Sequence, residues 1–237
     1  MIFMPDKLRR ALKAIYYYGK RNYCPCCDHR LRRFIPMFGR TGAMCPVCGA
    51  MERHRLVWLY LINKTNLLHK SICILHLAPE DALFKRISNL PNVMYLTGDL
   101  SSPKAKTIFD ITNMPFRENR FDCLICCHLL EHVPEDLKAM EEMFRVLKHG
   151  GWALFQHPID CNREQTFEDL NVVAPKDREK IFGQKDHVRI YGKDIKARLE
   201  SAGFVVRIQN YIEEFEEQAT QKYGLKRDEI IYFCEKS

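Results

Sequence analysis

Four short apolar runs between residues 72 and 155 constrain the fold of this chain more than any other feature. The runs cover residues 72–77, 93–96, 123–127 and 152–155, and each is continuous and rich in strand-forming residues. Continuous apolar character is typical of strands in a parallel sheet covered on both faces. Between the last two runs, apolar residues recur at three- and four-residue spacing, which predicts a helix ending at Gly150 and Gly151. The pattern therefore predicts a doubly wound α/β domain whose ligand lies beyond the carboxyl ends of the strands.

Other segments of the chain have weaker but regular patterns. They predict helices over residues 6–20, 51–64, 81–88, 176–182 and 193–201, and two last strands over 204–209 and 229–234. The segment 213–229, between those strands, is charged, and we expect it to be exposed. The polar segment 156–194 is long and poor in apolar periodicity, which favours an insertion that covers the substrate.

Two Cys-x-x-Cys pairs lie in the first fifth of the chain. Cys24 and Cys27 form the first pair, and Cys45 and Cys48 form the second, which continues into a glycine. Four thiolates at this spacing are typical of a tetrahedral structural zinc site, with an iron–sulfur cluster as the alternative. Because four protein ligands leave no open coordination position, we predict that Zn²⁺ supports folding rather than catalysis. Cys26 lies inside the first pair but out of register with the pattern.

Positive charge is concentrated at the start of the chain. Residues 1–70 carry fourteen Lys and Arg against three Asp and Glu, whereas the net charge of the whole chain is +7. Such asymmetry is consistent with a polyanionic partner such as RNA, or with a solvated basic surface beside a more acidic domain.

The composition favours a folded protein in a reducing compartment. Apolar residues make up 46% of the chain and charged residues 28%, over a length that allows one α/β domain and a small appendage. The first ten residues lack the apolar core of a signal peptide, and no run of eighteen apolar residues predicts a membrane span. Eleven cysteines without an export signal indicate thiols that bind metal rather than pair. We therefore expect a cytoplasmic protein.

Four segments match a known enzyme family in order and spacing. They read TGDLS, FDITNMPF, FDCLICCHLLEHV and RVLKHGGWALF. From about residue 71 to the C-terminus, the chain resembles the class I S-adenosylmethionine-dependent methyltransferases, and within them the type 11 group. The resemblance implies a Rossmann-like, seven-stranded, doubly wound sheet with an antiparallel edge hairpin, to which the small four-cysteine zinc ribbon is added. It divides the chain into an N-terminal helix and zinc ribbon (1–50), a bridging helix (51–70) and a methyltransferase domain (71–237).

The same resemblance implies a cofactor site for S-adenosylmethionine. In such a site Asp99 would bind the ribose hydroxyls, Asp110 would meet the adenine amino group, and Ile111 would contact the ring. The loop after the first strand departs from the family pattern acid-x-Gly-x-Gly, because the first acid is replaced by His76 and the second glycine by Glu80. We hypothesise that Glu80 binds the ammonium group of the cofactor, the alternative being a pocket that has lost the cofactor. The expected cofactor contacts are His76, Ala78, Glu80, Asp99, Leu100, Asp110, Ile111 and His128.

Histidines gather where the fourth and fifth strands end, on the side expected to face the cleft. An imidazole has an unperturbed pKa near neutrality, so it suits removal of a proton from a methyl acceptor. The candidate catalytic residues are His128, His157 and His187, and the candidate substrate contacts are Glu131, His132, Arg189 and Tyr191. Two alternatives assign structural roles: His128 and Glu131 would hold their loop together, and Arg189 would form an ion pair with a nearby aspartate.

Three functions compete on these observations. The first is methyl transfer to a hydroxyl or carboxyl of a small-molecule or saccharide-like acceptor. The second keeps the chemistry but takes RNA as substrate, with the basic ribbon as the docking module. The third is a non-catalytic binding module, motivated by the missing loop glycines. A nicotinamide dehydrogenase is disfavoured, because G-x-G-x-x-G is absent after the first strand.

Overall fold

The computed structural model of the protein describes residues 5–237, and its chain forms two compact units. Unit 1 comprises residues 1–71, 80–93 and 210–229, and unit 2 comprises 72–79, 94–209 and 230–237. Residues 1–4, part of the stretch predicted to lack a signal peptide, lie outside the described residues. No helix in the described part of the chain is long and apolar enough to cross a membrane.

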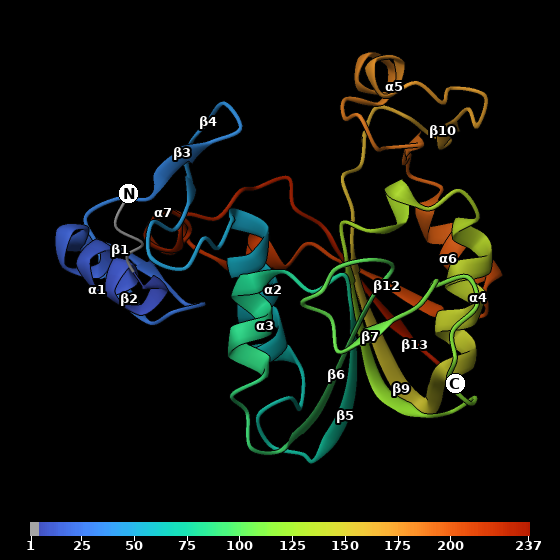
Figure 1. Ribbon diagram of the computed structural model, residues 1–237, viewed down its shortest axis with the longest axis horizontal. Coiled ribbons are helices and arrows are strands. Elements are labelled where there is room, and N and C mark those ends of the chain that lie inside the picture. The colour runs from blue at the N-terminus through green and yellow to red at the C-terminus, as the bar shows by residue number, and fades with distance from the viewer. Residues whose placement is uncertain (1–4) are drawn as a thin grey trace. The chain divides into compact units, whose positions relative to one another are not determined.

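Unit 2 is built on a seven-stranded mixed sheet, which confirms the predicted fold class (Figure 1). The strand order is β12-β13-β9-β8-β5-β6-β7. The central strand β8 pairs in parallel with both β5 and β9, and β13 runs antiparallel to β9 and to β12, as the predicted edge hairpin requires. The strands are β5 (Ile72–Leu77), β6 (Val93–Asp99), β7 (Thr107–Ile108), β8 (Phe121–Cys127), β9 (Leu147–Gln156), β12 (Val205–Gln209) and β13 (Ile231–Glu235).

Helices α4 (Asp136–Val146) and α6 (Ile195–Ser201) pack on one face of this sheet (Figure 1). Their apolar sides bury Met140, Met143 and Leu199 in one cluster with the strand residues Leu124 and Phe155. Apolar periodicity therefore selects the face of each helix that the sheet covers. The segment between β9 and β12 also carries the short pair β10 (Phe167–Glu168) and β11 (Arg189–Ile190) and helix α5 (Pro175–Phe182), while the 3₁₀ turn η1 (Leu130–His132) precedes α4.

The predicted end of α4 was wrong. The helix stops at Val146 rather than at the glycine pair, and Leu147 already belongs to β9. Leu147 pairs with Phe121 at the start of β8, and this long-range pairing overrides the local helical spacing. Gly150 takes a positive φ of 72° inside the β9 segment, a conformation that favours glycine.

Unit 1 contains the cysteine pairs and small antiparallel ladders. Its elements are α1 (Asp6–Tyr16), β1 (Tyr18–Cys24), β2 (His29–Leu31), β3 (Ile35–Met37), β4 (Arg40–Met44), α2 (Glu52–Lys64), α3 (Asp81–Ile87), η2 (Tyr211–Glu214) and α7 (Glu217–Tyr223). Helix α1 is shorter than predicted, because strand β1 begins at Tyr18 and pairs with β2.

The segment 213–229 is not simply the exposed, charged connection that we expected. Tyr211 and Ile212 just before it, and Thr220 within it, are buried. The side chain of Asn22 in β1 donates a 2.8 Å hydrogen bond to the carbonyl of Gln221 in α7. This segment therefore packs on the ribbon within unit 1, and its charged residues cover only its outer side.

Candidate functional site

A cavity of about 300 Å³ opens at the carboxyl ends of the parallel strands in unit 2. This is the edge of the sheet where α/β proteins bind ligands. The volume is at the lower end of the range for small-molecule sites, about 300–1,000 Å³. The cavity is lined by Ala78, Gly98, Asp99, Leu100, Asp110, Ile111, Thr112, Leu129, His132, Val133, Pro134 and Glu135.

Asp99 enters the cavity from the last position of β6. Its Oδ1 accepts hydrogen bonds from the backbone N–H groups of Ser101 and Ser102, at 2.9 and 2.8 Å. These two bonds fix the carboxylate at the rim, because a side chain with bonded neighbours loses its rotamer freedom. Within described residues 5–237, both of these loop amides contact Oδ1 and not Oδ2.

Asp110 lies on the same cavity, in the turn after β7. Its Oδ1 accepts 2.8 Å hydrogen bonds from both the backbone N–H and the hydroxyl of Thr112. Asp110 is exposed, whereas Ile111 beside it is buried at 7% exposure. A charged acceptor next to an apolar surface is the arrangement that recognises the polar edge and the face of an aromatic base.

Two non-glycine residues with positive φ shape the strand ends at this edge of the sheet. Ala78 after β5 has φ 45°, and its N–H donates to the carbonyl of Gly98 at 2.8 Å. His128 after β8 has φ 49°, and its N–H donates to the carbonyl of Gln156 at 2.8 Å. Such conformations cost free energy outside glycine and cluster at functional sites.

Three of the predicted cofactor contacts, His76, Glu80 and His128, are not among the residues that line the cavity. His76 is fully buried within β5, outside the residues that line the cavity, and its Nδ1 lies 2.7 Å from the hydroxyl of Tyr95. Glu80 belongs to unit 1, where its Oε1 lies 3.6 Å from Nε2 of His54. This contact lies within unit 1, and the role of Glu80 as the ammonium ligand stays a prediction.

The predicted catalytic histidines meet around one buried carboxylate. Glu131 is 1% exposed. Its Oε1 lies 3.4 Å from Nδ1 of His128, and its Oε2 lies 3.4 Å from Nδ1 of His157. Ligand atoms of Glu131, His132 and His187 also lie within 4.8 Å of one another. The structure thus brings four histidines from three chain segments onto one glutamate.

The contacts within this cluster shift the pKa values of Glu131 and His187. Burial alone would raise the pKa of Glu131, but the hydrogen-bonding contacts with His128 and His157 hold that pKa well below its usual range. The pKa of His187 is lowered, because burial disfavours its charged form more than the nearby Glu131 favours it. The carboxylate at the centre is therefore ionised at neutral pH.

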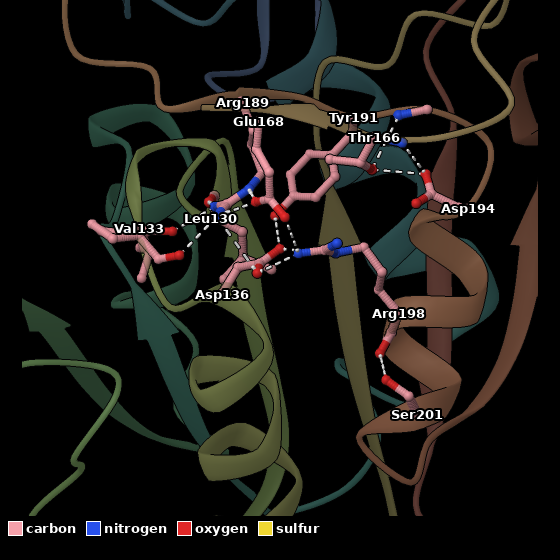
Figure 2. Close-up of polar contacts among 12 residues, drawn as sticks. Leu130, Val133, Asp136, Thr166, Glu168, Arg189, Tyr191, Asp194, Arg198 and Ser201 are labelled. Carbon is pink, nitrogen blue, oxygen red and sulfur yellow. Dashed lines mark hydrogen bonds and ion pairs between the residues drawn. The ribbon is translucent and has the colours of Figure 1, made fainter. Parts of the chain in front are cut away.

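Arg189 and Tyr191, predicted as substrate contacts, lie in a buried polar network around Asp136 (Figure 2). Arg189 is 1% exposed and donates to the carbonyls of Leu130, Val133 and Pro134 at 2.7, 2.5 and 2.8 Å. Val133 and Pro134 line the cavity. Arg189 thus holds the loop that forms one wall of the cavity. This is a structural role, as in the alternative given above, but the main partners are backbone carbonyls rather than one aspartate.

Asp136, Glu168 and Arg198 complete this network, although no sequence pattern singles them out. Asp136 accepts from the Tyr191 hydroxyl at 2.7 Å and from Arg198 at 2.6 Å, and Glu168 accepts from Arg189 at 2.9 Å (Figure 2). Asp136 and Arg198 are separated by 62 positions, so no local motif joins them.

The four cysteines of the two Cys-x-x-Cys pairs converge in unit 1. Sγ of Cys24 lies 3.7 Å from Sγ of Cys48, and Sγ of Cys27 lies 3.8 Å from Sγ of Cys45. With Zn–S bonds of about 2.3 Å, a tetrahedral ion needs sulfur atoms about 3.8 Å apart. The sulfur spacing therefore fits tetrahedral Zn²⁺. Cys26 is excluded from the group, and its Sγ lies 3.5 Å from the carbonyl oxygen of His54.

Comparisons with known proteins find methyltransferases that are similar to part of this chain. A family model described as "Methyltransferase domain" matches residues 94–155. The ubiquinone/menaquinone biosynthesis C-methyltransferase UbiE of Haemophilus ducreyi is 30% identical over 105 residues, which are 39% of this chain. The chain covers 40% of the length of that curated relative.

Solved structures share the fold. The [4+2]-cyclase SpnF superposes with a TM-score of 0.53 at 13% identity, over 79% of this chain and 83% of that one. Phosphoethanolamine N-methyltransferase 2 of Haemonchus contortus, solved in complex with S-adenosyl-L-methionine, superposes with a TM-score of 0.50 at 14% identity, over 75% of this chain and 51% of that one. Residues 94–155 of this chain are thus similar to the methyltransferase-domain family, and the seven-stranded sheet is the fold that these solved structures share.

Proposed function

We propose that this protein transfers a methyl group from S-adenosylmethionine to a hydroxyl or carboxyl oxygen of a small-molecule or saccharide-like acceptor. The observation that carries the proposal is the cavity at the carboxyl ends of the strands, with Asp99 and Asp110 fixed on its wall. The two carboxylates fit the cofactor, because one can accept hydrogen bonds from two ribose hydroxyls and the other from an adenine amino group. Leu100, Ile111 and Leu129 offer apolar surface to the base.

When bound, S-adenosylmethionine supplies a methyl group on a sulfonium, which an oxygen nucleophile displaces in line. The chain's own residues must orient the acceptor and take its proton. His128 and His157 are the candidate bases. With Nδ1 of each ring directed at Glu131, Nε2 is the atom that can receive a proton.

A second cavity, also of about 300 Å³, supports a separate place for the acceptor within unit 2. It is lined by residues of the segment after β9, among them Ile159, Phe182, His187 and Arg189. His132 lines the first cavity and His187 the second, and their ring centroids lie 4.7 Å apart. The contact between His132 and His187 therefore connects the wall of the cofactor cavity with the wall of the proposed acceptor cavity.

Asp99→Asn is expected to weaken S-adenosylmethionine binding by roughly 10- to 100-fold, because a charged hydrogen bond contributes about 1.5–3 kcal/mol. Isothermal titration calorimetry of the full chain measures the loss. Asp122→Asn is the matched control, since Asp122 lies on the same sheet at the amino end of β8, where it pairs with Lys148. Equal affinity in Asp99→Asn and the parent protein would contradict the proposed role of Asp99 in binding S-adenosylmethionine.

Glu80→Ala tests the hypothesis that Glu80 binds the cofactor ammonium. We expect about a tenfold lower affinity in the same titration, from loss of one charged contact. His54→Ala removes the His54–Glu80 ion pair but keeps the carboxylate, so it separates a ligand role from a structural one. If both variants lose affinity equally, Glu80 acts through unit 1 and not on the cofactor.

Other acceptors are distinguishable by experiment. The similarity to UbiE favours a quinone ring carbon as the second candidate, and a labelled-methyl assay on a demethylated quinone tests it.

RNA is favoured by a basic cavity of about 1020 Å³ in unit 1, lined by Arg21, Arg33, Arg40, Lys222 and Lys226 among others. A steep fall of RNA binding with added salt would support that substrate. If zinc-loaded protein binds no cofactor, the non-catalytic module is the correct function.

We also propose that Cys24, Cys27, Cys45 and Cys48 bind one structural Zn²⁺. The sulfur spacing supports this assignment, and so does the burial of three of the four residues. A cytoplasmic location fits a protein with reduced, metal-binding thiols, and it remains part of the proposal.

A further inference from the structure

The cluster around Glu131 has a composition that methyl transfer alone does not require. Glu131, His132 and His187 each place one possible ligand atom within 4.8 Å of the others. Two imidazoles and one carboxylate form the ligand set of many zinc and non-haem iron sites with open coordination positions. None of these residues belongs to the cysteine cluster, which lies in unit 1.

We propose that Glu131, His132 and His187 bind a divalent transition-metal ion of the Zn²⁺ class. The site would lie in unit 2, between the cofactor cavity and the cavity lined by the segment after β9. A set of three protein ligands leaves at least one coordination position open, so an oxygen of a small molecule can complete it.

Burial supports binding of a cation at this place. Glu131 and His187 are 1% and 5% exposed, and a buried carboxylate is costly unless it is paired with positive charge or coordinates a metal. Within described residues 5–237, Glu131 Oε1 has no partner in hydrogen-bonding geometry, and Nδ1 of His128 lies 3.4 Å from it. A carboxylate oxygen carries two lone pairs, so it can face His128 and a metal ion together.

The surrounding histidines supply a second observation. His157 is 4% exposed, and its Nε2 is buried with no hydrogen-bond partner in the described part of the chain; the same holds for Nε2 of His128. Their Nδ1 atoms face Glu131. Groups that orient a coordinating carboxylate are a regular part of metal sites and fix its geometry. His128 and His157 would take this positioning role toward Glu131.

The ion has a chemical use that rests on the proposed function. A metal-bound hydroxyl has a lowered pKa, so the acceptor oxygen would become a better nucleophile before it meets the methyl group. The proton would leave to a neighbouring imidazole such as His128 or His157, and the new bond would form between the acceptor oxygen and the methyl carbon as the carbon–sulfur bond breaks. Metal binding itself does not depend on this step.

Cobalt binding to the full chain tests the site. Protein with its cysteine site saturated by Zn²⁺ is dialysed against Co²⁺, and the metal is counted by mass spectrometry. We expect one further equivalent, with visible d–d absorption and without the near-ultraviolet thiolate-to-cobalt band. His132→Ala and His187→Ala should each weaken cobalt binding at least tenfold, whereas the exposed His69→Ala should not change it. Circular dichroism confirms that each variant is folded.

Three outcomes overturn the metal site: no further equivalent, a thiolate-to-cobalt band, or unchanged affinity in both histidine variants. The role of the ion is tested separately. If the wild-type protein binds the metal but methyl transfer is equal with and without it, the catalytic use fails while the site stands. If metal binds and no acceptor is methylated, the proposed function fails and the metal site again stands.

Discussion

Replacing Cys45 with serine is expected to abolish the proposed binding of structural Zn²⁺ and to unfold the ribbon in unit 1. Cys45 is fully buried, and a serine hydroxyl is a much poorer zinc ligand than a thiolate. Zinc binding contributes on the order of 10 kcal/mol to the folding of small Cys-ligated modules. Strands β1 to β4 are three to seven residues long. Metal analysis should show one zinc fewer per chain, and limited proteolysis should cut within residues 18–48.

Cys26→Ser is the matched control for this experiment. Cys26 is a neighbouring thiol of similar burial, and its sulfur contacts the carbonyl of His54 instead of the other cysteines. The control should keep its zinc and its protease resistance. A colourless protein dismisses the iron–sulfur alternative. If Cys45→Ser retains both the zinc and the proteolytic pattern of the parent, the four-cysteine assignment is wrong.

Arg189→Met is expected to lower the free energy of unfolding by roughly 3–5 kcal/mol, the usual cost of removing one partner from a buried ion pair. Methionine fills a similar volume but leaves the carbonyls of Leu130, Val133 and Pro134 without their donor. Cofactor affinity should also fall, because this loop forms a wall of the cavity. Urea denaturation gives the first quantity, and calorimetric titration gives the second.

An exposed arginine provides the comparison. Arg163 lies in the same segment and pairs with Asp160 at 3.1 Å, with its side chain 44% exposed. Surface pairs of this kind are worth about 0–1 kcal/mol, so Arg163→Met should be nearly neutral. If Arg189→Met proves equally neutral and lowers only the affinity for an acceptor, Arg189 binds substrate and does not hold the loop.

The features that were predictable from sequence are those encoded over short distances. The continuous apolar runs specified the parallel strands, since residues buried on both faces cannot alternate with polar ones. The two cysteine pairs are local motifs, and their ligand atoms meet because each pair occupies one tight turn. Asp99 and Asp110 follow neighbouring strands, so the structure places both on one cavity.

The features that were missed depend on contacts between distant positions. The α4 boundary is set by the pairing of Leu147 with Phe121, which no helical period reveals. The segment 213–229 has the charge pattern of a free surface, yet its backbone satisfies a buried guanidinium. Arg55 in α2, which is fully buried, donates to the carbonyls of Tyr223 and Gly224 at 2.7 and 2.5 Å, and to those of Ala43 and Ala50 at 3.0 and 2.7 Å. Contacts between one side chain and four backbone carbonyls cannot be predicted from the amino-acid sequence, because carbonyls are common to all residues.

The division of the chain into interleaved segments has a consequence for how this protein can be cut or rearranged. Residues 80–93 and 210–229 complete unit 1, although stretches of unit 2 flank both of them in the sequence. Removal of residues 1–70 would therefore leave two segments of unit 1 in the remaining polypeptide, and the carbonyls of Tyr223 and Gly224 would lose Arg55 as their donor. The four cysteines and the rest of unit 1 therefore cannot be exchanged between relatives as one N-terminal segment. Insertions or deletions near α7 would also affect its contact with Asn22, almost two hundred positions away.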